Sequence, residues 1–168
     1  MSSALELVVR TILIGVVATT VLDLWSLLAT RLFGFPPANW ALVGRWIGHF
    51  PQGRFVHESI AAALPVRHEL LIGWVTHYVI GVVYAAVLAV AAGSEWLNHP
   101  SLLPAHIVAW IALVAPFFIM QPGMGAGIAA SRTPHPGKAR LRSVLAHTAF
   151  GLGLYLAALL GAAFLPPF

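Results

Sequence analysis

The sequence predicts an all-α integral membrane protein with four antiparallel transmembrane helices and an amphipathic, interfacial helical insertion between helices one and two. Three observations predict this class: four long apolar stretches, a composition that is 60% hydrophobic and 8% charged, and basic residues gathered in two loops. A spanning helix needs ~20 mostly apolar residues, and each stretch reaches that length. The 168 residues suffice for one four-helix domain and no second domain.

The first helix is expected over about residues 11–33, because Gly34, Pro36 and Pro37 cannot continue it. The insertion follows over about residues 38–64. Asn39 is placed to cap a short helix whose apolar residues share one side, so this helix is expected to lie flat at headgroup depth. A second short helix is expected over residues 57–63.

The other three helices are expected over about residues 70–92, 102–121 and 144–165. In the third helix, Pro104 falls in the first turn, where proline is tolerated. Pro116 falls near the other end and predicts a kink. A glycine-rich turn and a basic loop separate this helix from the fourth.

The positions of the basic residues predict the orientation. Eight of the nine lysines and arginines lie in the loops after the first and third helices or, for Arg31, in the last turn of the first helix; the exception is Arg10. By the positive-inside rule these loops face the cytoplasm, and both termini lie outside. The expected partners are the bilayer and its anionic headgroups, with a homo-oligomer or a membrane partner left open. Nucleic acid is not expected, because the cations do not cluster as a nucleic-acid footprint does.

The absence of cysteine excludes disulfides, thiolate metal sites, thiol nucleophiles and covalently attached haem. The sequence contains no nucleophile elbow and no paired carboxylates at a useful spacing. Enzyme chemistry therefore has little support.

Four polar residues inside the apolar stretches fall at a similar depth. Asp23, His77 and His147 are expected ~8–12 Å from the inner boundary, and Gln121 closes the third helix at that end. Half the hydrocarbon thickness is ~15 Å, so all four belong to one leaflet. Ionisable residues inside a membrane are a functional-site hypothesis by default.

The spacing of small residues places this cluster on helix contacts. Thr19, the fifth candidate member of this polar cluster, lies four residues before Asp23 and four after Gly15, so these three share one stripe of the first helix. Four-residue steps also join His77 to Gly73 and Gly81, and such stripes let helices approach closely in lipid.

Several interpretations of this cluster stay open. The side chains could bond one another and only hold the bundle together, in a structural or accessory subunit that binds a partner protein or lipid. They could instead handle a proton, a metal ion or a small solute, with Asp23, His77 and His147 as the candidate metal ligands. A third interpretation is haem b, with His77 and His147 as axial ligands.

Glycines 123, 125 and 127 follow a membrane helix rather than a strand, so they do not form a dinucleotide fingerprint. Close packing, or a re-entrant turn supported by Gln121, is the favoured interpretation. The alternative is that Gly123, Gly125 and Gly127 form a nest of amides that binds a lipid phosphate beside Arg132.

Three segments resemble the signature of a bacterial domain-of-unknown-function family of small polytopic inner-membrane proteins. They are NWALVGRW with the following residues to His57, MQPGMGAG with the basic loop after it, and His147 with the FGLGLY run at 150–155. The resemblance covers nearly the whole chain. It implies location and topology, and it supplies no reaction, substrate or cofactor.

Overall fold

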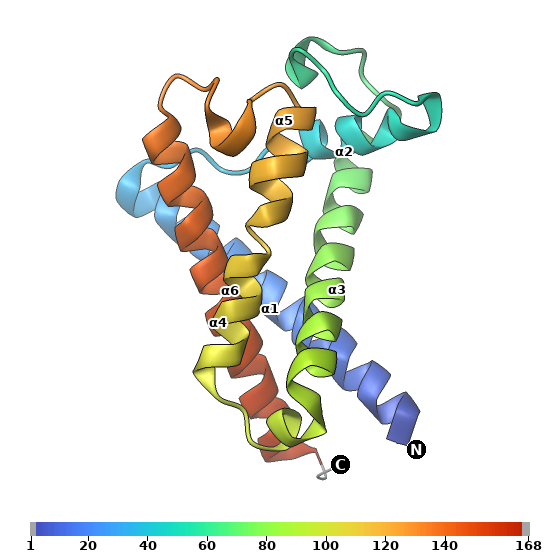
Figure 1. Cartoon of the computed structure of the whole chain (residues 1–168), viewed down its shortest axis with the longest axis vertical. Helices are drawn as coiled ribbons and strands as arrows, with labels where there is room; N and C mark the ends of the chain where they lie inside the picture. The colour runs from blue at the N-terminus through green and yellow to red at the C-terminus, as the bar shows by residue number, and fades with distance from the viewer. Residues whose placement is uncertain (1–2, 166–168) are drawn as a thin grey trace.

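The structure is a computed structural model that describes residues 3–165, and all the regular structure in that range is helical. Four helical segments are long and apolar enough to cross a membrane: Ala4–Phe33, Glu69–Asn98, Leu102–Gly123 and Pro136–Phe164. The predicted all-helical class is therefore confirmed, and Figure 1 shows the four long segments side by side.

Helix α1 covers Ser3–Phe33 and starts well before the predicted residue 11. An ion pair between Glu6 and Arg10, one turn apart, lies within this additional part of the helix. Hydropathy alone does not reveal a turn stabilised in this way. The helix ends at Phe33, and Gly34 follows with a positive φ of 65°.

The insertion contains α2 at Trp40–Gly48, where Asn39 caps the helix as predicted by accepting from the Leu42 amide at 3.3 Å. Two short 3-10 turns follow, η1 at Phe50–Gln52 and η2 at Ile60–Ala62. The second short helix expected over 57–63 is thus a single turn. Ala63 is already extended, and Pro65 disfavours a helical conformation in the residue before it.

Helix α3 covers Glu69–Asn98 and is interrupted at Gly93, where φ is 76° and ψ is 175°. The predicted end near residue 92 coincides with this break. The chain then continues helically, because Trp96 and Leu97 are buried in the core and hold the additional turn against it.

The third long segment changes its winding at the predicted kink. It comprises α4 at Leu102–Ile111, a π-helical turn η3 at Ala115–Met120 and a short α5 at Gln121–Gly123. Pro116 lies in the π-helical turn, where its missing N–H removes one regular bond. A 3-10 turn, η4 at Ile128–Ala130, leads to α6 at Pro136–Phe164.

Glycines set the close crossings of the long helices. Gly15 of α1 packs on the backbone of Gly81 and Val82 in α3, and Gly153 of α6 packs on Ala18 of α1. In Figure 1, α1 passes diagonally behind α3 and α6, while α4 lies against α6. The prediction that these small residues lie on helix–helix contacts is confirmed for the Gly15 and Gly81 stripes.

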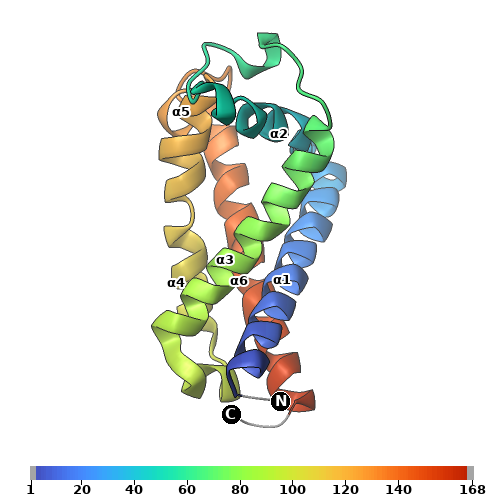
Figure 2. The same cartoon turned by 90° about the vertical axis from the view of Figure 1, so that its right-hand side faces the viewer.

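Two connections meet at one end of the bundle. The insertion with α2 lies across the upper end in Figure 2, beside α5 and the turn that follows it. The His57 amide donates to the Gly123 carbonyl at 2.8 Å, and the Ile60 amide donates to the Met124 carbonyl at 3.1 Å. The insertion is therefore bonded to the third long segment.

Candidate functional site

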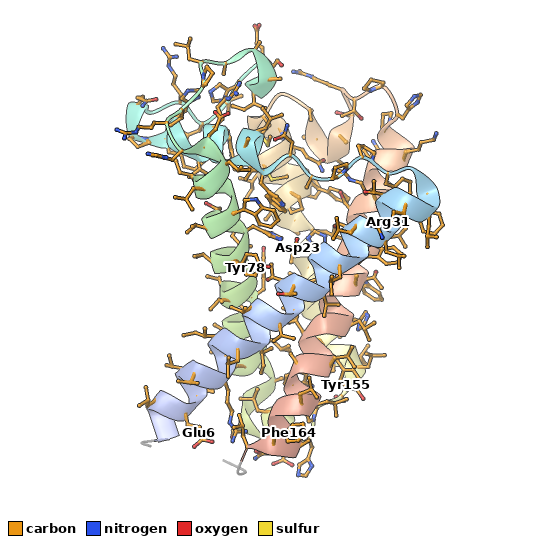
Figure 3. The ribbon with its side chains drawn as sticks, turned by 180° about the vertical axis from the view of Figure 1, so that it is seen from behind. Glu6, Asp23, Arg31, Tyr78, Tyr155 and Phe164 are labelled. Carbon is orange, nitrogen blue, oxygen red and sulfur yellow. The ribbon has the colours of Figure 1, made fainter. Side chains whose placement is uncertain are left out.

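Asp23 joins α1 to α3 through both of its carboxylate oxygens. His77 Nε2 lies 3.0 Å from Oδ1, and the Tyr78 hydroxyl donates to Oδ2 at 3.0 Å. A carboxylate only accepts, so His77 carries its hydrogen on Nε2. Figure 3 shows Asp23 and Tyr78 on neighbouring helices. The two residues that sequence reasoning placed at one depth are thus in direct contact.

Helix α2 covers this pair with an aromatic ring. The Trp40 and His77 rings are stacked with their centroids 3.9 Å apart, and Trp74 packs on Trp40 with centroids at 5.7 Å. Helix α2 can lie so close because Gly44 packs on the backbone of Glu69 and Gly73 in α3. The insertion therefore forms one wall around the polar pair.

His147 and Gln121 approach the same region from α6 and the third segment. The His147 Nδ1 lies 2.9 Å from the Ser143 carbonyl, which accepts, so Nδ1 carries the hydrogen and Nε2 is left as an acceptor in the neutral ring. Within residues 3–165, the Gln121 amide oxygen is buried and has no hydrogen-bond partner. Neither side chain bonds directly to Asp23 or His77 in that range.

Thr19 serves the helix contact. Its hydroxyl donates to the Gly15 carbonyl at 2.7 Å, and its side chain is buried against Gly81. It also lines the site one helical turn before Asp23, where α1 and α3 cross.

A cavity of ≈ 700 Å³ lies among these groups. All five residues that the sequence analysis placed in one polar cluster line it, and so does Arg142 from the start of α6. Their role in handling a proton, an ion or a solute stays a prediction. Most of the remaining wall is apolar or aromatic: Leu22, Trp25, Phe35, Trp40, Trp74, Ile80, Tyr84, Ala115, Ile119, Ala146 and Phe150.

The donor set does not resemble a metal site. In the described range 3–165, no group of three or more histidine and acidic side chains is arranged to hold a metal ion.

The glycine-rich turn packs tightly against the insertion. A side chain at Gly123 would lie 2.8 Å from the Trp46 ring, and one at Gly125, where φ is 92°, would lie 2.9 Å from the His57 carbonyl. The Gly125 amide donates to the Pro122 carbonyl at 3.1 Å, so it already has a partner. Gly127 lies against the Arg132 side chain. Anion or lipid binding at this turn stays a prediction.

An ion pair fixes the insertion to α3. Arg45 donates from Nε and Nη2 to the two oxygens of Glu69, each at 2.9 Å, and from Nη1 to the carbonyls of Ala61 and Ala63. The hydrogen-bonded carboxylate of Glu69 raises the pKa of Arg45 above its usual value. Nearby, His49 Nδ1 and His57 Nε2 lie 2.9 Å apart, so one ring donates and the other accepts.

Sequence reasoning missed three groups at this site. Tyr78 directly follows His77, but its bond to Asp23 depends on how α1 and α3 cross. Trp40 was expected only on the apolar side of the interfacial helix, at headgroup depth, and not in a stack on His77. Arg142 was counted as a loop cation, because α6 was expected to start at residue 144 rather than at Pro136.

The lengths and compositions of the four long helical segments are those of a multi-pass membrane protein. The chain belongs to the family described as "Protein of unknown function (DUF2938)", which it matches over residues 12–161. No curated protein and no solved structure matches it. The family resemblance found in the sequence is thereby confirmed, and the family's description assigns neither a transport nor a redox role.

Proposed function

We propose that this protein is a bacterial inner-membrane protein of four antiparallel helices that binds a small apolar or amphipathic solute inside its own bundle. The proposal takes the basic loops as cytoplasmic and both chain ends as outside. The observation that carries it is the cavity of ≈ 700 Å³. Small-molecule sites have this size and combine mostly apolar walls with a few convergent polar groups.

The polar groups of the cavity support solute handling over simple bundle stability. Asp23 holds His77 in one tautomer, and within the described chain His77 has no hydrogen bond from Nδ1. In the neutral ring this leaves Nδ1 as an acceptor that a donor group of a bound solute can reach. The buried side-chain oxygen of Gln121 has no hydrogen-bond donor within residues 3–165. A hydroxyl or amine of a bound solute would supply that donor.

The walls of the cavity support entry from the bilayer. Leu27 and Ile119 line the cavity, and each is 60% exposed on the surface of the bundle. A solute dissolved in the membrane would therefore reach the cavity between helices. This route favours an apolar or amphipathic solute over a hydrated ion, which would have to shed its water first.

The test is to fill the cavity and then measure what the protein retains. Ala146 lines the cavity from α6, whereas Val144, two residues earlier, is exposed. Native mass spectrometry of protein purified in mild detergent should detect a retained small molecule in the wild type and in Val144→Trp. Ala146→Trp should lose it while its melting temperature stays close to that of the control.

A second pair separates loss of binding from loss of folding. Ala115→Phe extends into the cavity from η3, and its neighbour Val114→Phe extends outward from an exposed position. Retention of the same bound mass by both cavity-filling variants would overturn the proposal. It would favour the alternative of a structural or accessory subunit, for which a stable partner in a pull-down is the expected observation.

A further inference from the structure

Arg142 places a positive charge on the wall of the cavity. It lies on α6 and is half-buried, and its Nη1 donates to the Pro36 carbonyl at 2.7 Å. Among residues 3–165 no carboxylate forms an ion pair with it. A guanidinium has five N–H donors, so this single bond leaves most of its capacity unused.

Arg45 shows a different arrangement, in which several partners within the protein bind the guanidinium. Arg45 lies at the same end of the bundle and has both oxygens of Glu69 and two backbone carbonyls as partners. Arg142 shares its cavity with Asp23, but the two oxygens of Asp23 bond His77 and Tyr78. The charge of Arg142 is therefore uncompensated in mostly apolar surroundings.

Arg142 is the first residue of α6 that lines the cavity, and beyond His147 the lining residue of α6 is the apolar Phe150. Phe150 lies eight residues after Arg142 and also lines the cavity, which corresponds to ~12 Å along the helix axis. Tyr84 and Ile80 of α3 line the cavity as well. A ligand with a charged head at Arg142 and an apolar tail toward Phe150 matches this arrangement.

From this placement we propose that the solute is an anionic amphiphile, a molecule with a carboxylate or phosphate head and a hydrocarbon tail. Arg142 binds the head, and the aromatic walls bind the tail. The inference rests on the proposed function, because it names the class of solute that the cavity holds. Arginine suits this role, since its planar donors match carboxylate and phosphate oxygens in pairs.

The chain offers a direct optical test, because Trp25, Trp40, Trp46 and Trp74 line the cavity and bromine atoms quench tryptophan fluorescence. The probes are a fatty acid, phosphatidylglycerol and zwitterionic phosphatidylcholine, each with a brominated tail. In the wild type, the anionic probes should quench at about tenfold lower concentration than phosphatidylcholine. The fatty acid and phosphatidylglycerol arms distinguish the two sources of the anionic head.

The variants isolate the head contact. Arg142→Gln should quench equally with all three probes, whereas Arg142→Lys should keep part of the preference for anions. Arg140→Gln is the matched control, because Arg140 is an exposed cation on the same helix that donates to the Ala129 carbonyl at 2.8 Å. The preference should survive that change.

The outcomes separate the two proposals. Equal quenching by all probes in the wild type, or equal loss of preference in Arg140→Gln and Arg142→Gln, would overturn the assignment of Arg142 and leave solute binding intact. Unchanged quenching of Ala115→Phe, which fills the cavity without adding a tryptophan, would instead overturn the proposed function itself. If Arg142→Gln does not fold, Arg142→Lys is the deciding variant. The inference is overturned if Arg142→Lys shows no preference for the anionic probes.

Discussion

His77 Nε2 lies 3.0 Å from Oδ1 of Asp23, and this contact joins α3 to α1 within two segments that are apolar enough to span a membrane. Both side chains are largely covered, with exposed fractions of 10% for His77 and 21% for Asp23. Separating them would leave Oδ1 of Asp23 without its donor in apolar surroundings, although Tyr78 still donates to Oδ2, and this costs more than the bond itself contributes.

A double-mutant cycle measures this coupling. Asp23→Leu removes the acceptors at similar size, and His77→Phe removes the donor while keeping a ring for Trp40. We expect a coupling of about 0.6–2 kcal/mol in the free energy of unfolding in detergent. A cycle of Asp23→Leu with Thr148→Val, at a position that bonds Trp110 instead, should be additive. A coupling near zero for Asp23 and His77 would contradict the bond.

The crossing of α1 and α3 predicts a strong position dependence for glycine substitutions. A side chain at Gly15 would lie 2.8 Å from the Val82 backbone nitrogen, whereas one at Gly161 would meet nothing within 4 Å. We expect Gly15→Ala to lower the free energy of unfolding by about 1–3 kcal/mol. Gly161→Ala should raise it by up to ~1 kcal/mol, because alanine is the better helix former. Thermal unfolding of both variants in one detergent is the measurement, and equal melting temperatures would refute the close crossing.

The pairing of Asp23 with His77 could be anticipated from the sequence because depth follows from simple counting. Asp23 lies eight residues before Arg31, and His77 lies eight residues after Glu69. Because consecutive membrane-spanning helices run in opposite directions, these equal distances place both side chains at the same depth. The contact of Tyr78 with Asp23 could not be anticipated in this way. It depends on the rotation of α3 about its axis, which is set by packing at Gly81 and Thr19.

Helix ends were predicted well only where the helix stops at the same residue as its apolar stretch. Helix α1 ends at Phe33 in both, because a glycine and two prolines follow. Helix α6 starts at Pro136, eight residues before the expected start, because its first two turns carry lysine and arginine. Hydropathy reports the part of a helix that suits lipid, so the polar extension that brings Arg142 to the cavity was assigned to a loop.

The bond between Arg45 and Glu69 should stabilise the insertion over a wide pH range. Glu69→Gln keeps the size of the side chain and removes its charge, and Arg45 and Glu69 are partly exposed at 13% and 20%. We therefore expect a loss of about 1 kcal/mol, with faster amide exchange in α2. Glu58→Gln, at an exposed acidic position of the same insertion, is the control.

The stability that is lost in Glu69→Gln should depend on pH in a way that follows from the pKa of Arg45. Glu69 raises the pKa of Arg45 in the folded protein above its usual value. A raised pKa contributes stability that is fully present below the unfolded-state pKa and is lost only as the pH rises through the folded-state value. The difference between wild type and Glu69→Gln should therefore stay constant between about pH 6 and pH 9. A difference that vanishes within this window would mean that the ion pair does not hold the insertion.

The orientation proposed from the basic loops can be tested with two single cysteines, because the natural chain contains none. Ser59 lies in the insertion and Ser101 lies before α4, and both are exposed positions where cysteine preserves the size of the side chain. A membrane-impermeant maleimide should label Ser101→Cys in intact spheroplasts, and it should label Ser59→Cys only after the membrane is opened. The reason is that the basic residues of the loops after the first and third long helices keep these loops in the cytoplasm. The unsubstituted chain gives the background. Labelling of Ser59→Cys in intact spheroplasts would reverse the orientation, and it would place the cavity beneath the outer surface of the membrane.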